Sequence, residues 1–213
     1  NNRDKKEDKV FNYLVVGTSG AGKTSIIRAF DGQEFDEVHE PTTISSMYEL
    51  KKRSALLRAL EIGGARDSRS KMNEMYNLFD YDALIFVIDG SDPQSYNDAK
   101  LQLLSIMNCQ CEEIENIPVL VMVNKADLET KIDPKELQKI VGEAAKGRRN
   151  FANVYVVSSK TGKNITKGFE DLSSHLNPQF CCCDNRYQKT KKSFSEGQST
   201  PNVKSTADSK PPF

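Results

Sequence analysis

Residues 17–24, with the sequence GTSGAGKT, constrain the fold of this chain more than any other feature. They follow the apolar run 10–16 and precede a helical pattern at 25–30. In this context, the glycines let the backbone direct successive N–H groups at phosphate oxygens, and the helix start adds its positive end. The segment therefore predicts a phosphate-binding loop. The alternative, a glycine-rich turn without a ligand, is disfavoured because strand, loop and helix are all present.

The residue types of this loop match distinct roles toward a nucleoside triphosphate. We expect Lys23 to reach the outer phosphates as a point charge, and the Thr24 hydroxyl to coordinate a magnesium ion that bridges them. The loop does not identify the base. The candidate phosphate-contacting residues are Gly17, Gly20, Ala21, Gly22, Lys23, Thr24 and Ser25.

Composition places this loop in one domain of ordinary size. We expect a flexible segment at 1–9, a domain at 10–176 and a disordered polar and basic tail at 177–213. The 30 Lys and Arg balance the 30 Asp and Glu, which argues against a nucleic-acid partner. Apolar runs are short, residues 1–9 have no signal-peptide core, and the five cysteines lack the spacing of a secreted disulfide framework. A cytoplasmic protein is expected.

Strand-like and helix-like segments alternate through the domain. Strands are expected at 10–16, 46–50, 55–62, 83–88, 119–123 and 154–157, with the second and third joined as a hairpin. Helices are expected at 25–30, up to about 79, after Asp92-Pro93, from Pro134 to about 145, and at 165–176. This alternation predicts an α/β fold in which a mostly parallel sheet carries helices on both faces.

A second motif lies at the same predicted sheet edge, where such folds bind ligands. Asn124, Lys125 and Asp127 follow the strand 119–123. The Asp127 carboxylate can accept two hydrogen bonds from guanine, whereas adenine would leave this charged acceptor unpaired. Guanine is therefore the expected base. Asn124 is expected to tie this segment to the phosphate loop, and the stems of Lys125 and Lys160 to cover the two faces of the base. Without the phosphate loop, an ordinary polar loop would explain 124–127 equally well.

In order and spacing, residues 17–24, Thr43-Ile44, 61–64, 124–127 and 158–160 resemble those of a Ras-superfamily small GTPase. The double glycine Gly63-Gly64 resembles the Arf-like (ADP-ribosylation-factor-like) branch. The resemblance covers about 10–176. It implies a P-loop NTPase small G domain with a six-stranded sheet, GTP or GDP with Mg²⁺, and two switch segments. It also implies a monomer that acts through effector and regulator proteins.

The resemblance assigns further roles to single residues. Thr43 would complete the magnesium coordination when a γ-phosphate is present, with Thr42 as its rival. Gly64 would offer its N–H to that phosphate, and the Ser159 N–H would meet the guanine oxygen. Lys23, Thr43 and Gly64 are thus the candidate catalytic residues, and Thr24, Thr43 and Glu61 the candidate metal residues. A Thr-Ile pair at a strand start also has a plain explanation in β propensity.

The chain departs from the family pattern at two positions. Glu61 stands where the family usually has Asp, so its water-mediated hold on magnesium must accommodate an extra methylene. Ala65 stands where the family has the Gln that orients the attacking water, and a methyl group cannot form hydrogen bonds. We therefore predict slow intrinsic hydrolysis or a need for a partner. Arg66 is interpreted as a solvated residue.

The tail carries Cys181, Cys182 and Cys183, followed by several basic residues. Acylation of these thiols together with attraction to anionic lipid would give peripheral membrane association. Free thiols are an equally good interpretation.

Three functions remain compatible with these residues. The first is a GTP-controlled switch that recruits effectors in membrane traffic. The second is a scaffold that holds GTP permanently, which the Ala65 substitution favours. The third is another P-loop enzyme, such as a nucleoside kinase or an ATPase, which Asp127 argues against.

Overall fold

The computed structural model describes residues 9–37, 45–52, 55–63, 80–108, 117–146, 152–176 and 189–190. Its centre is a single sheet with the strand order β6-β5-β4-β1-β3-β2-β7. The β2–β3 pair and the β2–β7 pair are antiparallel, and all other neighbours are parallel. The strands are β1 (Lys9–Gly17), β2 (Ser45–Lys52), β3 (Ala55–Ile62), β4 (Ala83–Asp89), β5 (Val119–Asn124), β6 (Ala152–Val156) and β7 (Lys189–Thr190).

The main sheet is the six-stranded, mostly parallel sheet that the sequence predicted, including the hairpin of β2 and β3. Two details differ. The last long strand, β6, begins two residues before the expected 154 and ends at Val156. The two-residue strand β7 pairs with the outer edge of β2 inside the tail that we expected to be disordered. It adds a seventh, very short strand without changing the fold class.

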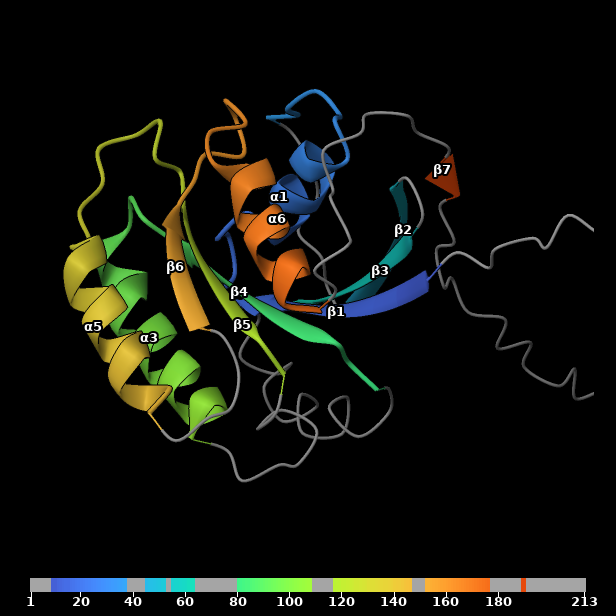
Figure 1. Cartoon of the computed structure of the whole chain (residues 1–213). Coiled ribbons are helices and arrows are strands. Elements are labelled where there is room, and N and C mark those ends of the chain that lie inside the picture. Colours follow the sequence, from blue (N-terminus) through green and yellow to red (C-terminus); the bar gives the residue numbers. More distant parts are fainter. Residues whose placement is uncertain are drawn as a thin grey trace, which may run out of the picture.

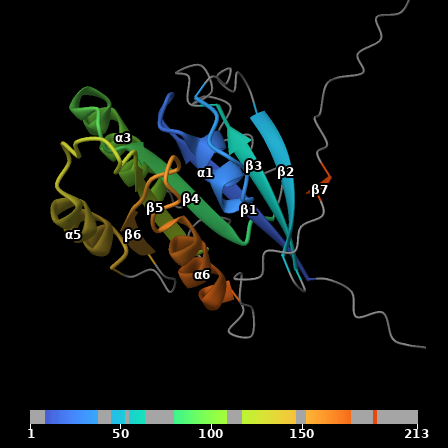
Figure 2. The same cartoon turned by 90° about the horizontal axis from the view of Figure 1, so that it is seen from above.

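In the described part of the chain, four helices cover both faces of the sheet (Figures 1 and 2). The helices α1 and α6 pack on one face with a core that includes Ile27, Phe169 and Leu57, while α3 and α5 pack on the other with Leu103, Val141 and Phe86. The helices are α1 (Lys23–Phe30), α3 (Pro93–Met107), α5 (Pro134–Ala144) and α6 (Ile165–Leu176).

The starts of α3 and α5 follow from short local signals. Asp92 accepts a hydrogen bond from the Gln94 N–H at 2.9 Å, and Asp133 accepts one from the Lys135 N–H at 2.9 Å. In each case a proline occupies the first turn, where its missing N–H costs nothing. The predicted helix starts at Asp92-Pro93 and Pro134 are therefore confirmed.

The central strands β4 and β5 are buried along their whole length. A parallel strand covered by helices on both faces has no polar side to expose, which explains these uninterrupted apolar runs. Their carboxyl ends place Asp89 and Asn124 side by side at one edge of the sheet. This edge also receives the loop after β1, so the topology brings the two motifs together.

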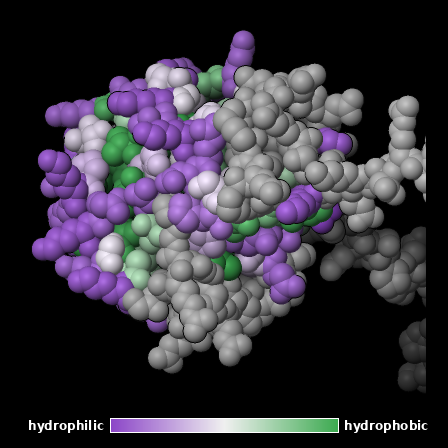
Figure 3. Space-filling model, viewed as in Figure 1, coloured by the Kyte–Doolittle hydropathy of each residue, from purple (hydrophilic) through white to green (hydrophobic). Residues whose placement is uncertain are grey.

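On the face in Figure 3, hydrophilic side chains cover most of the coloured surface and hydrophobic ones are scattered among them. Within the described residues, no helix combines the length and the apolar character that crossing a membrane requires. The expected helix ending near 79 and the residues Thr42, Thr43, Gly64, Ala65, Arg66, Cys181, Cys182 and Cys183 lie outside the described residues.

Candidate nucleotide-binding site

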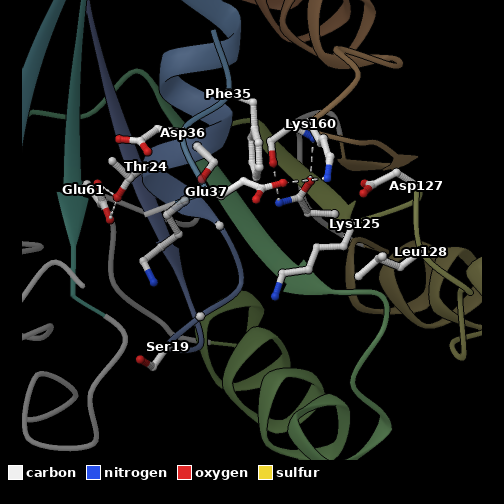
Figure 4. Close-up of a pocket in the computed structure, with 16 residues that line it drawn as sticks. Ser19, Thr24, Phe35, Asp36, Glu37, Glu61, Lys125, Asp127, Leu128 and Lys160 are labelled. Carbon is white, nitrogen blue, oxygen red and sulfur yellow. Dashed lines mark hydrogen bonds and ion pairs between the residues drawn. The ribbon is translucent and has the colours of Figure 1, made fainter. Parts of the chain in front are cut away.

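The two motifs line one cavity of about 490 Å³ at the carboxyl edge of the sheet (Figure 4). This volume is typical of sites for small ligands and cofactors. Thr24 and Glu61 lie at one end of the cavity, and Asp127 and Leu128 lie at the other. The predicted residues that line it are Gly20, Gly22, Lys23, Thr24, Ser25, Glu61, Asn124, Lys125, Asp127, Ser159 and Lys160. Gly17 and Ala21, which were also predicted, are not among the residues that line the cavity.

Two glycines of the phosphate loop are required by their surroundings. Gly17 and Gly22 have φ values of 143° and 88°, which L side chains rarely adopt. A Cβ on Gly17 would collide with the carbonyl oxygen of Val87 on β4, and a Cβ on Gly22 would collide with the Asn124 amide. The loop therefore lies so close to β4 and to the end of β5 that only glycine fits at either position.

Lys23, at the first position of α1, is only 4% exposed. Its Nζ donates to the carbonyl oxygens of Gly17 at 3.1 Å and Thr18 at 2.9 Å, so the ammonium group lies inside the curve of its own loop. Burial lowers the pKa of Lys23, and the nearby Glu61 carboxylate partly opposes this effect. A phosphate group in the cavity would give this buried cation an anionic partner.

Thr24 and Glu61 form a buried polar pair below the loop. The Thr24 hydroxyl lies 2.8 Å from each carboxylate oxygen of Glu61, which is 2% exposed at the end of β3. These hard oxygen donors suit magnesium, which commonly takes one or two protein carboxylates and obtains other ligands from substrate phosphates. Within the described residues, no cluster of three or more His, Cys, Asp or Glu forms a metal site made of protein alone. The pair thus fits a metal that is completed by a phosphate ligand.

Asn124 joins the two ends of the cavity, which we call the phosphate end, at Thr24 and Glu61, and the base end, at Asp127 and Leu128. Its fully buried amide donates to the Ala21 carbonyl oxygen at 3.0 Å and to the Ser159 hydroxyl at 3.2 Å. Its amide oxygen accepts the Ser159 N–H at 3.0 Å. One side chain therefore fixes three loops that are far apart in sequence.

Asp127 is held in place by one of its two carboxylate oxygens. Oδ1 accepts the Ser158 hydroxyl at 2.6 Å, and Ser158 is itself fully buried. Asp127 is exposed and lines the cavity. The carboxylate is thus oriented before any ligand binds, which reduces the ordering cost of recognition.

Lys125 is oriented by an ion pair with Asp89 at the end of β4. Its Nζ lies 2.6 Å from Asp89 Oδ2, and its backbone has the unusual φ value of 67°. Burial alone would raise the pKa of Asp89, but hydrogen bonds from Lys125 and Ser91 outweigh burial and lower it. The charged head is therefore directed at β4 while the stem remains at the cavity wall.

Lys160 meets residues of the loop after α1. Its Nζ lies 3.0 Å from Glu37 Oε1 and 5.7 Å from the centre of the Phe35 ring. Figure 4 shows the Phe35 ring and Lys160 on the same side of the cavity. Both side chains of the ion pair are more than half exposed, so this contact is open to solvent.

Sequence reasoning missed five residues of the cavity wall: Ser19, Phe35, Asp36, Glu37 and Leu128. Phe35 is the only Phe, Tyr or Trp in the polar stretch 31–41, which is a usable signal for a ligand contact. Asp36 and Glu37 had no such signal, since acidic residues in an exposed loop are common.

Together these residues can hold an anion at one end and a flat polar ring at the other. Backbone N–H groups and Lys23 offer positive charge to phosphates, and Asp127 offers an acceptor to a base with adjacent N–H donors. A strand–loop–helix phosphate site on such a sheet, joined to this base loop, defines a small GTPase of the Ras superfamily.

The chain belongs to the ADP-ribosylation factor family, whose sequence model matches residues 2–176. As a member of this family it is a GTP-binding protein. This result and the fold confirm the Arf-like resemblance and the predicted fold class.

Several relatives have a similar length. The chain is 25% identical to ADP-ribosylation factor-like protein 2 of Arabidopsis thaliana over 176 residues, which cover 81% of this chain and 92% of that protein. It is 28% identical to ADP-ribosylation factor-like protein 3 of Chlamydomonas reinhardtii over 167 residues, which cover 78% and 90%.

One solved structure shares the fold. It is the Arl6 BBS3 small GTPase from Trypanosoma brucei with bound nucleotide analogue GppNp, with a TM-score of 0.68 and 21% identity. The similarity covers 81% of this chain and all of that one.

Proposed function

We propose that this protein is a guanine-nucleotide switch that recruits effector proteins when it holds GTP and that hydrolyses GTP slowly. The observation that carries the proposal is the oriented Asp127 carboxylate in the same cavity as the phosphate loop. Guanine is the purine whose adjacent donors satisfy this acceptor. The expected switch segments around Thr43 and Gly64 would change when the γ-phosphate is lost.

In GTP hydrolysis, the protein would position the nucleotide and stabilise its charge, without forming a covalent intermediate. Lys23 and the backbone of 20–24 would stabilise the phosphates, while Thr24 and Glu61 would hold magnesium, which neutralises charge on the phosphate oxygens. The Phe35 ring and the Lys125 and Lys160 stems would enclose the base and exclude water. These interactions position the nucleotide, which is a large part of phosphoryl-transfer catalysis.

Ala65 provides no group that could orient the attacking water. Positioning by the loop would leave residual hydrolysis, and a partner protein would accelerate it by supplying the missing group. The acylation of Cys181, Cys182 and Cys183 remains part of this proposal and would bring the switch to a membrane surface.

An Asp127→Asn variant tests the proposal. The amide can donate to a carbonyl, so the variant should lose GTP affinity and gain affinity for xanthosine triphosphate, whose base has a carbonyl where guanine has its amino group. Competition against a fluorescent nucleotide measures both affinities. Unchanged preference for GTP, or ATP competing as well as GTP with the wild type, would contradict the proposal.

The scaffold interpretation stays as a second candidate because of Ala65. Single-turnover hydrolysis of GTP separates the two: the wild type should convert its bound GTP slowly, and Ala65→Gln should accelerate this conversion. A wild type without any turnover would favour the permanently GTP-bound scaffold. The family match removes support from the third candidate, a nucleoside kinase or ATPase.

A further inference from the structure

Glu61 has a second hydroxyl partner besides Thr24. The Tyr48 hydroxyl donates to Glu61 Oε2 at 3.2 Å, while the Thr24 hydroxyl lies 2.8 Å from both Oε1 and Oε2. A carboxylate that is 2% exposed needs such donors, because an unpaired buried charge is costly. The two oxygens of Glu61 are therefore not equivalent: Tyr48 binds only Oε2.

The register of the β2–β3 hairpin explains why these two side chains meet. Ser46 lies opposite Glu61 and Tyr48 lies opposite Ala59, so Tyr48 is the diagonal neighbour of Glu61 on the same face. Diagonal neighbours are about 7–8 Å apart and meet only through long side chains. Glutamate is longer than aspartate by one methylene, about 1.5 Å, so the aspartate usual in the family would withdraw the carboxylate from Tyr48.

The Tyr48 hydroxyl is the donor in this contact, because a carboxylate can only accept. Tyr48 also packs against the core under α1 and α6, which fixes its ring.

We propose that Tyr48 is a positioning residue for magnesium: it holds Glu61 by Oε2 so that Oε1 and the Thr24 hydroxyl face the metal at the phosphate end of the cavity. This inference rests on the proposed function, because the metal is bound together with a guanine nucleotide. It also gives a physical reason for the glutamate at position 61, where the family usually has aspartate. The longer carboxylate and the tyrosine form one unit, and removal of either should weaken the hold on the metal.

The test compares Tyr48→Phe with wild type by two separate measurements. Electron paramagnetic resonance titration of Mn²⁺ into the GDP complex reports metal affinity, and we expect an approximately tenfold loss, as for other groups that orient metal ligands. Fluorescent GDP binding in excess EDTA reports affinity without metal, and we expect no change. If wild type binds no GDP, the proposed function fails. If Tyr48→Phe binds GDP and holds Mn²⁺ as wild type does, only the present inference fails.

Tyr155→Phe is the matched control. The Tyr155 hydroxyl donates to Asp171 Oδ2 at 2.8 Å, and burial together with Asp171 raises its pKa to about 12. This second tyrosine–carboxylate pair joins β6 to α6, away from the cavity walls. The Tyr155→Phe variant should lose a comparable hydrogen bond without any loss of Mn²⁺ affinity. An equal loss of Mn²⁺ affinity in both variants would indicate a general effect on folding and overturn the proposal.

A double-mutant cycle keeps the test informative if one variant is unstable. In a Glu61→Asp background, the shorter carboxylate no longer reaches the tyrosine, so adding Tyr48→Phe should change Mn²⁺ affinity by less than about twofold. The same substitution in the Glu61 background should give the approximately tenfold loss. Additive effects of the two substitutions would overturn the idea that Tyr48 acts through Glu61.

Discussion

The two ends of the cavity hold their charged groups in opposite ways. At the phosphate end, Lys23 and Glu61 are buried and bound to protein partners, the first to carbonyl oxygens of its own loop and the second to Thr24. At the base end, Asp127 and Lys160 are exposed, and neighbours fix only part of each side chain. The phosphate end is therefore organised by buried contacts within the protein, whereas the groups of the base end are exposed and oriented by single neighbours.

From this difference we expect the two ends to contribute to different properties of nucleotide binding. Buried charges gain most from a new partner because the low local dielectric strengthens the interaction, so the phosphate end should dominate affinity. Exposed, oriented groups contribute less energy each but exclude the wrong ligand, so the base end should dominate specificity. Four substitutions test this comparison.

The largest effect is expected at Lys23. Lys23→Met keeps the length of the side chain but removes its charge, so GDP affinity should fall more than about hundredfold through loss of several charge-assisted contacts. Isothermal titration calorimetry measures this change, and circular dichroism checks the fold. Lys139→Met on the exposed face of α5 is the control and should bind normally. If GDP affinity fell less than tenfold, the claim that the phosphate end dominates affinity would be contradicted.

Gly22 lies where the two ends meet, and its replacement should affect folding. Gly22→Ala combines a φ of 88° with a collision against the Asn124 amide, so we expect a loss of about 2 kcal/mol in the free energy of unfolding. Gly142→Ala in α5 has open space around its new methyl group and should stabilise the protein by about 0.5–1 kcal/mol. Urea denaturation measures both, and a loss in both variants would contradict the local explanation.

Phe35 tests the base end. Its side chain is 39% exposed in this structure, and stacking on a base would cover it. Phe35→Ala should accelerate GDP release about tenfold, as expected for loss of one aromatic stacking contact. Leu101→Ala on α3, which removes a more exposed apolar side chain at 68%, should leave release unchanged. Stopped-flow fluorescence compares them, and equal rates for both variants would exclude the stacking role.

The smallest effect is expected for the exposed ion pair of Glu37 and Lys160. Glu37→Gln should increase GDP release by at most about threefold, because exposed pairs contribute little, and the difference should vanish at high salt. Glu136→Gln disrupts a similar exposed pair with Lys100 on the α3–α5 side and should have no effect on release. If the rate of GDP release increased more than tenfold at all salt concentrations, this pair would control release. The base end would then contribute more to affinity than we expect.

Much of the fold could be predicted because its signals are local. The Asp92-Pro93 and Asp133-Pro134 pairs start helices through contacts two residues away, and the apolar runs of β4 and β5 reflect burial on both faces. Sequence-based expectation was less accurate at the edges. The start of β6 and the pairing of β7 with β2 depend on neighbouring strands rather than on local residue preference.

Residue types and spacing alone predicted the kind of site: glycines where the backbone must turn, one lysine and one threonine after them, and one aspartate that we expect to select the base. The tertiary structure decided which partners orient these groups: Asp89 beside Lys125, Phe35 beside Lys160, and Tyr48 beside Glu61. Motif residues act through local backbone geometry, whereas their partners come from other elements: strand pairing places Asp89 and Tyr48, and the loop after α1 places Phe35. Such contacts between elements that are distant in sequence are difficult to predict from residue types and spacing.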